Sequence, residues 1–201
     1  MKVWYALLTM IQSSFFRKLQ KEHQVFREGR DVIIGVSRKA LTASKQAIFA
    51  CHREDRLVAK TLLEEAEKQI AIASRWTAKH SLLVNEGSLR AALEEYVEAK
   101  YFLMLLEGKK IDRIPHLPLD YELLLGGLCD LTGELVRYSV LAVTKGRHTE
   151  VHKYYASVET IMGELVKMDL TGKLRQKFDD AKRNLKRMEE MLYDLAIKFR
   201  S

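Results

Sequence analysis

Proline and glycine are scarce in this chain, with two prolines and ten glycines among 201 residues. Both residues interrupt helices, and the long segments between them are rich in Ala, Leu, Glu and Lys, which favour helix. Apolar residues recur in these segments at steps of three and four. A hydrophobic content of 47% is enough for one substantial core. We therefore expect an all-α fold, a single-domain bundle of about seven helices over residues 1–201.

Cysteine is nearly absent as well. Cys51 and Cys129 lie far apart in apolar helical segments, and no zinc-ligand spacing is present. The simplest interpretation is two reduced thiols in the core of a cytosolic protein, so we expect a cytoplasmic location.

Long apolar runs without charge are also missing. The most apolar stretch, residues 119–143, carries Asp130, Glu134 and Arg137, and no window reaches the roughly 18 uncharged apolar residues that a membrane span needs. The start, MKVWYALLTMIQSS, has one lysine before a short apolar run, as a secretory leader does, but it lacks a clear cleavage site and runs on into a helical pattern. We expect a soluble protein with no membrane partner.

Positive charge is in excess, with a formal charge of +7 and a pI near 9.3. This balance favours an anionic partner, either nucleic acid or an acidic membrane surface, and says nothing of the fold.

The expected helices are separated by short breaks. They span, in order, about residues 3–28, 31–52, 56–79, 88–108, 119–143, 149–167 and 171–198. Gly29 and Gly35 leave open whether the first two form one bent rod. Ser88 is the expected N-cap of the fourth helix and Gly108 its end, and Asp120 lies at the positive start of the fifth. The connection KKIDRIPHLP is the only stretch that contains proline.

Two pairs of carboxylates interrupt otherwise buried helical stripes. Asp130 and Glu134 are four residues apart, and Glu95 and Glu98 are three apart, so each pair shares one helix face. Mg²⁺ and Mn²⁺ prefer oxygen ligands, and sites for phosphodiester hydrolysis gather several carboxylates around such ions. The spacing is compatible with a metal site if the two helices are neighbours.

Other interpretations of these charges remain open. Glu94 and Glu95 could form a solvated helix edge, and Asp130 or Glu134 could pair with Arg137 or with a lysine from another helix. A di-iron bundle is disfavoured, because none of the six histidines follows a glutamate by three residues. Serine or cysteine hydrolases are not excluded, although neither a nucleophile elbow nor a glycine-rich phosphate loop occurs.

The segments LEEYVEAKYF and LDYELLLGGLCDLTGELVRYSVLAVTKG resemble the translin superfamily, and specifically its Trax (translin-associated factor X) branch. REGRDVIIGVSRKALTASKQAIFACHR and KLRQKFDDAKRNLKRMEEMLYDLAIKFR extend the resemblance over most of the chain. It implies a seven-helix bundle that assembles into hollow octamers. It also implies that Trax subunits carry a metal-dependent endoribonuclease for single-stranded RNA, whereas translin keeps the fold, lacks the acidic DLTGE pattern and binds RNA as a scaffold.

The resemblance places the catalytic, metal-binding residues at Glu95, Glu98, Asp130 and Glu134. Glu98 and Asp130 would be central ligands of Mg²⁺ or Mn²⁺, the other two would complete or orient the site, and water would attack the scissile phosphate in line. The connection between the fourth and fifth helices is shorter than in eukaryotic Trax, and the tail is short. The chain is therefore similar to microbial Trax-like proteins, and a homo-octamer without a separate translin partner is expected.

Single-stranded RNA also needs positive charge along a path to the metal. If the first two helices are continuous, one narrow stripe carries Arg27, Arg38, Lys45, His52 and Arg56, with Arg53 beside it. Arg90 either reaches RNA or closes a local ion pair. The stripe could equally be an ordinary solvated face.

These observations predict a metal-dependent endoribonuclease that cleaves single-stranded RNA, with single-stranded DNA as a further candidate substrate. The first alternative is a non-catalytic, oligomeric binder of single-stranded nucleic acid whose carboxylates are structural. The second is a scaffold that binds a partner protein through an apolar helix face.

Overall fold

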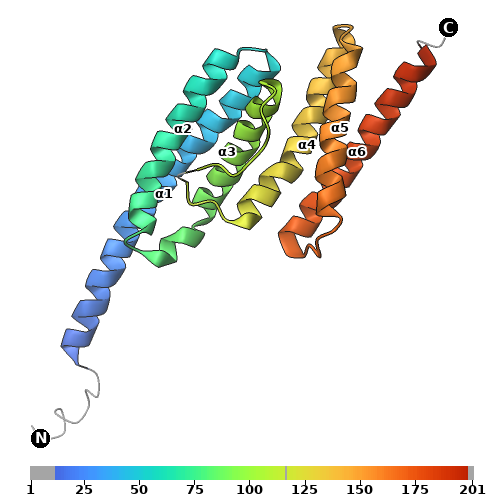
Figure 1. Cartoon of the computed structure of the whole chain (residues 1–201). Coiled ribbons are helices and arrows are strands. Elements are labelled where there is room, and N and C mark those ends of the chain that lie inside the picture. Colours follow the sequence, from blue (N-terminus) through green and yellow to red (C-terminus); the bar gives the residue numbers. More distant parts are fainter. Residues whose placement is uncertain (1–11, 116, 199–201) are drawn as a thin grey trace, which may run out of the picture.

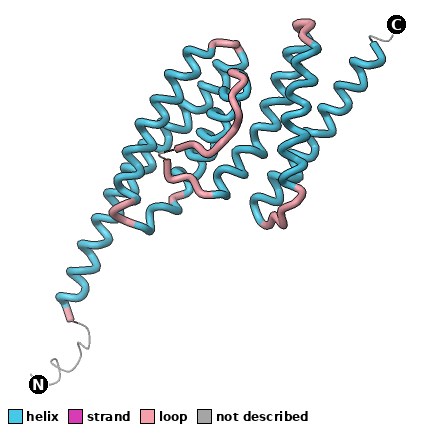
Figure 2. Tube along the Cα trace, in the orientation of Figure 1, coloured by secondary structure: helices cyan, strands magenta, loops and turns pink. Residues whose placement is uncertain are grey.

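The computed structural model describes residues 12–115 and 117–198, and the regular structure in these ranges is helical throughout (Figures 1 and 2). Six α-helices and one short 3-10 helix follow one another: α1 (Ser13–His52), α2 (Arg56–Thr77), η1 (Ser81–Asn85), α3 (Gly87–Leu106), α4 (Tyr121–Thr144), α5 (His148–Leu165) and α6 (Gly172–Lys198). The expected all-α fold is confirmed, with six α-helices in the described ranges where about seven were expected.

One long helix replaces the first two expected helices. α1 runs for 40 residues without a break at Gly29 or Gly35. A Cβ at Gly29 would lie 2.8 Å from the ring of Trp76 and 2.9 Å from Leu83, so this glycine permits close packing and does not end a helix. Residues 1–11, which make up most of the leader-like start, lie outside the described residues.

The N-terminal part of α1 projects beyond the other helices (Figure 1). Phe15 and Leu19, which the helical spacing places on an inward face, are therefore 55% and 41% exposed. The expectation of burial was wrong here because no other helix in residues 12–115 and 117–198 extends to this part of α1.

The helices pack as two groups. α1, α2 and α3 contact one another, α4, α5 and α6 contact one another, and the contact of α3 with α4 joins the groups (Figure 1). Residues of both groups form one core cluster, which includes Phe102 of α3, Leu131 of α4 and Met188 of α6.

The end of α3 and the start of α4 match the prediction from the sequence, whereas the start of α3 does not. Gly108 follows α3 with a φ of 72°, a conformation that favours glycine, and the Asp120 side chain caps α4 by accepting a hydrogen bond from the Leu123 N–H. Ser88 is not the N-cap of α3, because the helix already begins at Gly87.

Two adjacent glycines let α4 approach α3. A Cβ at Gly127 would lie 2.5 Å from Val97 Cγ1 and 3.1 Å from the backbone nitrogen of Glu98, and one at Gly126 would overlap Glu94 Oε1. The backbone of α4 therefore passes close to the middle of α3. This contact brings the two carboxylate pairs to the same place.

Within the described part of the chain, no helix is both long enough and apolar enough to cross a membrane. Cys51 and Cys129 are buried, free thiols, as expected. Burial raises the pKa of each thiol to about 12, so neither is a nucleophile at neutral pH.

Candidate active site

The four predicted carboxylates interact electrostatically across the contact of α3 with α4. Glu98 is only 9% exposed, and burial, followed by the charges of Asp130, Glu95 and Glu134, raises its pKa to about 9. The pKa of Glu95 is also raised, by burial and by the charges of Asp130 and Glu134 against an opposing effect of Lys45. The helix spacing and the glycine contact thus gather four acidic groups in one partly buried place.

The two helices differ in how their carboxylates are partnered. Glu95 and Glu98 of α3 have no hydrogen-bond or ion-pair partner among residues 12–115 and 117–198. On α4, Asp130 accepts a hydrogen bond from Lys177 of α6, and burial raises its pKa in spite of this partner. Glu134 contacts His52 and lies 3.6 Å from Arg137.

His52 does not belong to an exposed RNA-binding stripe. Its side chain is only 4% exposed, its Nε2 contacts Glu134, and its ring packs 5.0 Å from the ring of Phe102. The stripe prediction was wrong at this residue because the His52 side chain, at the end of α1, packs against Phe102 of α3 and contacts Glu134 of α4.

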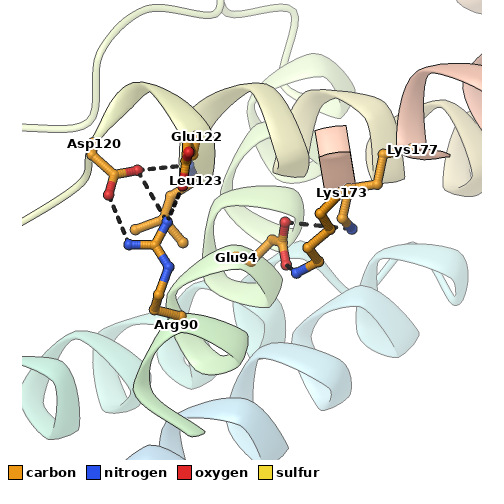
Figure 3. A network of polar contacts seen from close by, with 7 residues as sticks. All are labelled: Arg90, Glu94, Asp120, Glu122, Leu123, Lys173 and Lys177. Carbon is orange, nitrogen blue, oxygen red and sulfur yellow. Dashed lines mark hydrogen bonds and ion pairs between the residues drawn. The ribbon is translucent and has the colours of Figure 1, made fainter. Parts of the chain in front are cut away.

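Lys173 and Lys177 reach the site from the first turns of α6. Figure 3 shows both lysines turned towards Glu94, which pairs with Lys173 at 2.7 Å and with Lys177 at 3.4 Å. The Glu94 side chain is 12% exposed, so it does not lie on a solvated helix edge. Pairing of Asp130 with a lysine from another helix, the structural alternative for α4, does occur.

A cavity of about 420 Å³ opens beside the carboxylates. Its lining residues are Glu98, Cys129, Asp130, Asp180, Arg183, Asn184 and Arg187. Asn184 donates a hydrogen bond of 2.9 Å to Thr132 Oγ1, which fastens α6 beside α4. The site therefore has an acidic wall from α3 and α4 and a mixed, largely basic wall from α6.

Reasoning from the sequence missed the contribution of α6. The polar residues of this wall share one helix face at steps of three and four, next to the apolar stripe. They are Lys173, Lys177, Asp180, Asn184 and Arg187. That periodicity was the available signal, although it does not say which helix the face meets.

The donor chemistry of the site fits a hard divalent cation. Four carboxylates interact electrostatically here, and two of them are partly buried without a hydrogen-bond or ion-pair partner among the described residues, which is unfavourable unless a cation offsets their charge. In the side-chain positions described for residues 12–115 and 117–198, no three His, Cys, Asp or Glu are placed to hold a metal ion. Asp130 and Glu134 are engaged by Lys177 and His52, so a cation would need these contacts to rearrange.

The remaining residues of the predicted RNA path are on the surface. Arg27, Arg38 and Lys45 are exposed along α1, as the stripe predicts. Arg53 and Arg56 are also exposed, but α1 ends at His52, Arg53 is its C-cap and Arg56 begins α2, so the stripe along one helix does not continue to Arg56. Lys45 is the one whose charge lowers the pKa of Glu95, which places it near the acidic site.

Arg90 closes a local ion pair. It lies 2.8 Å from Asp120 and 2.9 Å from Glu122, at the start of α4 (Figure 3).

Known proteins share this architecture. The chain is similar to the structure titled "Crystal structure of apo-NeC3PO", with 24% identity and a TM-score of 0.80, over 90% of this chain and 96% of the other. It is also similar to "Structure of AfC3PO - duplex RNA complex", with 19% identity and a TM-score of 0.85, over 92% and 97% of the two chains. No curated protein sequence matched. The model of the Translin family matches residues 28–199, and on this evidence the chain belongs to the Translin family.

Proposed function

We propose that this protein is a metal-dependent endoribonuclease of the Trax branch that cleaves single-stranded RNA within a closed, Translin-like oligomer. One observation carries the proposal. Glu95 and Glu98 lie partly buried and unpartnered beside Asp130 and Glu134. Gathering like charges is costly, and proteins maintain such clusters chiefly at functional sites.

Each carboxylate has a proposed role. Glu98 and Asp130 would be central ligands of Mg²⁺ or Mn²⁺, and Glu95 and Glu134 would complete or orient the site. A divalent cation bound there supplies charge neutralisation and activation of water for phosphodiester hydrolysis. Glu98, whose pKa is about 9, holds a proton at neutral pH in the metal-free chain and would release it when the cation binds.

The basic groups around the site would hold the RNA backbone. Arg183 and Arg187 line the same cavity as Glu98 and Asp130, and Lys45 approaches from α1. Phosphates placed between these walls would gain electrostatic attraction while one of them reaches the carboxylates. The net charge of +7 supports a polyanionic substrate.

The comparisons support the partner classes of this proposal. One similar structure is, by its title, a complex with duplex RNA. The acidic DLTGE pattern at 130–134 favours the catalytic Trax branch over translin. We propose that the chain assembles as a homo-octamer without a separate translin subunit and that single-stranded DNA is a second substrate.

One observation favours a non-catalytic alternative. Asp130 and Glu134 already have partners in Lys177 and His52, as structural carboxylates would. A Translin-family scaffold that binds single-stranded RNA or DNA without cleaving it is therefore the second candidate function.

An end-labelled, unstructured RNA distinguishes the two functions. We would incubate it with Mg²⁺, Mn²⁺ or EDTA and with the unaltered chain, Glu98→Ala or Asp130→Ala. Glu122→Ala is the matched control, because it removes a carboxylate that pairs with Arg90 in the first turn of α4. The proposal predicts metal-dependent cleavage that Glu98→Ala and Asp130→Ala abolish and the control retains. RNA binding without cleavage in any metal would establish the scaffold instead.

A further inference from the structure

Lys177 is the side chain through which α6 enters the acidic site. Its ammonium donates a hydrogen bond to Asp130 Oδ2 and lies 3.4 Å from Glu94 Oε1, and only 17% of the side chain is exposed. Lys173, one turn earlier, pairs with Glu94 Oε2 at 2.7 Å but is 70% exposed. Glu94 therefore has a cation of its own, and Lys177 is the counter-ion of Asp130.

The pairing keeps a full positive charge inside the site. A lysine side chain is an ammonium at neutral pH, and this one lies between two carboxylates, those of Asp130 and Glu94. It holds one oxygen of a carboxylate that the proposed reaction needs for a divalent cation.

A divalent cation and this ammonium are poor neighbours on one carboxylate. Positive charges a few ångströms apart repel strongly in a partly buried site. Asp130 also lacks the freedom to join Glu98 around a common ion while Oδ2 faces Lys177. Consistent with this, the described side chains offer no group of three metal-ligating residues in a metal-holding arrangement.

We propose that Lys177 is a positioning residue of the acidic site, whose ammonium holds Asp130 in the metal-free chain and is displaced when a divalent cation binds. The proposal rests on the proposed function in that the four carboxylates form the cation site. Lys177 then competes with the cation, so the strength of its contact sets how much divalent cation the site requires.

An ordinary structural ion pair would behave differently. If Lys177 only fastens α6 to α4, removing its charge changes stability and leaves cation affinity unaltered. If it competes, removing its charge strengthens cation binding. The sign of the change in affinity therefore separates the two roles.

The test measures Mn²⁺ binding to the full chain without RNA at pH 8. The signal of free Mn²⁺ in electron paramagnetic resonance gives the dissociation constant. We expect Lys177→Met to lower the dissociation constant about tenfold, because repulsion between the two cations is removed. Lys173→Met is the matched control, since it removes the same charge from the same helix face without touching Asp130, and it should change affinity by less than about twofold. Lys177→Arg keeps the charge and should stay near the unaltered chain.

Further variants show at which site the Mn²⁺ binds and control for loss of folding. Adding Glu98→Ala to Lys177→Met should remove the gain in affinity, which assigns the bound Mn²⁺ to this site. Circular dichroism and sedimentation verify that the variants remain folded and assembled. If Lys177→Met does not fold, Lys177→Gln, which keeps a polar group beside Asp130, takes its place with the same expected gain.

Unchanged or weaker Mn²⁺ binding in the folded Lys177→Met or Lys177→Gln chain would overturn the proposal, as would a complete lack of Mn²⁺ binding. Unchanged or weaker binding in these variants is distinct from failure of the proposed function, whereas a complete lack of Mn²⁺ binding counts against both. A chain that cleaves RNA but shows no gain in affinity refutes the role of Lys177 alone. A chain that shows the gain but never cleaves RNA refutes the nuclease alone.

Discussion

α4 carries acidic groups in two regions with opposite character. At its first turn, Asp120 and Glu122 are largely exposed and pair with Arg90 (Figure 3). Burial raises the pKa of Asp120, but the hydrogen bonds from Arg90 and from the Leu123 N–H outweigh it and the pKa is lowered. In the middle of the helix, Asp130 has a raised pKa in spite of its lysine.

The two regions differ in their exposure to water and in the positively charged groups that the chain places beside the carboxylates. The first turn has water, a guanidinium and the positive end of the helix, so its charges are satisfied within the chain. The middle of α4 faces α3, where Glu95 and Glu98 add two more acidic groups. Within the described part of the chain these two have no hydrogen-bond or ion-pair partner. Carboxylates of one helix therefore serve as a cap and clamp at one place and as a candidate cation site at the other.

The largest expected contrast between the two regions is in catalysis. Glu98→Ala or Asp130→Ala should reduce metal-dependent RNA cleavage at least about a hundredfold, since several kcal/mol of transition-state stabilisation are lost with the cation. Glu122→Ala at the first turn should retain the rate. Initial rates of cleavage at saturating Mn²⁺ measure the contrast, and equal losses in all three variants would contradict it.

The second-largest contrast between the two regions is expected in the pH dependence of stability. Because the folded-state pKa of Glu98 is about 9, above the value of 4.5 for an ordinary glutamate, the folded state binds more protons than the unfolded state between these values. In EDTA, stability from this group is present at low pH and is lost as pH rises from about 4.5 through about 9. Glu98→Gln cannot ionise, so it should be more stable than the unaltered chain by up to about 3 kcal/mol at pH 7.

Urea unfolding in EDTA at several pH values measures this difference. Glu122→Gln at the first turn is the control and should show no such gain as pH rises. If the difference in unfolding free energy between Glu98→Gln and the unaltered chain stays constant from pH 5 to pH 9, the raised pKa of Glu98 is refuted as its cause.

The close contact of α4 with α3 at Gly127 can itself be altered. Gly127→Ala should destabilise the fold by about 1–3 kcal/mol, because the new Cβ would lie 2.5 Å from Val97 Cγ1 and must push α4 from α3. Gly163→Ala in α5 is the matched control, since a Cβ there meets nothing within 4 Å and should stabilise the helix by about 0.5–1 kcal/mol. Thermal or urea unfolding measures the change in stability of each variant. Changes of the same sign in both variants would argue against the close approach of α4 to α3.

The smallest effect is expected at the first turn. Arg90→Met should cost no more than about 1 kcal/mol of stability, because its ion pairs with Asp120 and Glu122 are solvent-exposed. Asp120 still caps α4 through the Leu123 N–H. RNA cleavage should stay unchanged, and the loss of stability should shrink as salt is added. A large loss of cleavage would assign Arg90 to RNA binding instead.

Helical periodicity predicted most of the fold but missed contacts that depend on the third dimension. It placed α2 to α6 close to their observed bounds, yet it left open whether α1 is one helix or two, because a glycine such as Gly29 can end a helix. Only the position of Trp76 and Leu83 shows that this glycine makes room for packing. The 3-10 helix η1 was likewise missed, since a turn this short has no periodic signal.

The sequence by itself determined that the chain is helical, that each pair of carboxylates shares one helix face, and that the DLTGE pattern lies on an apolar helix. These follow from local geometry, because 3.6 residues per turn fix which side chains point together. Only the tertiary structure decided that Gly127 brings α4 onto α3, that Asp130 faces Lys177 and that His52 turns inward to Glu134. The period of a helix fixes the faces of that helix, whereas packing of the whole core selects which distant face it meets.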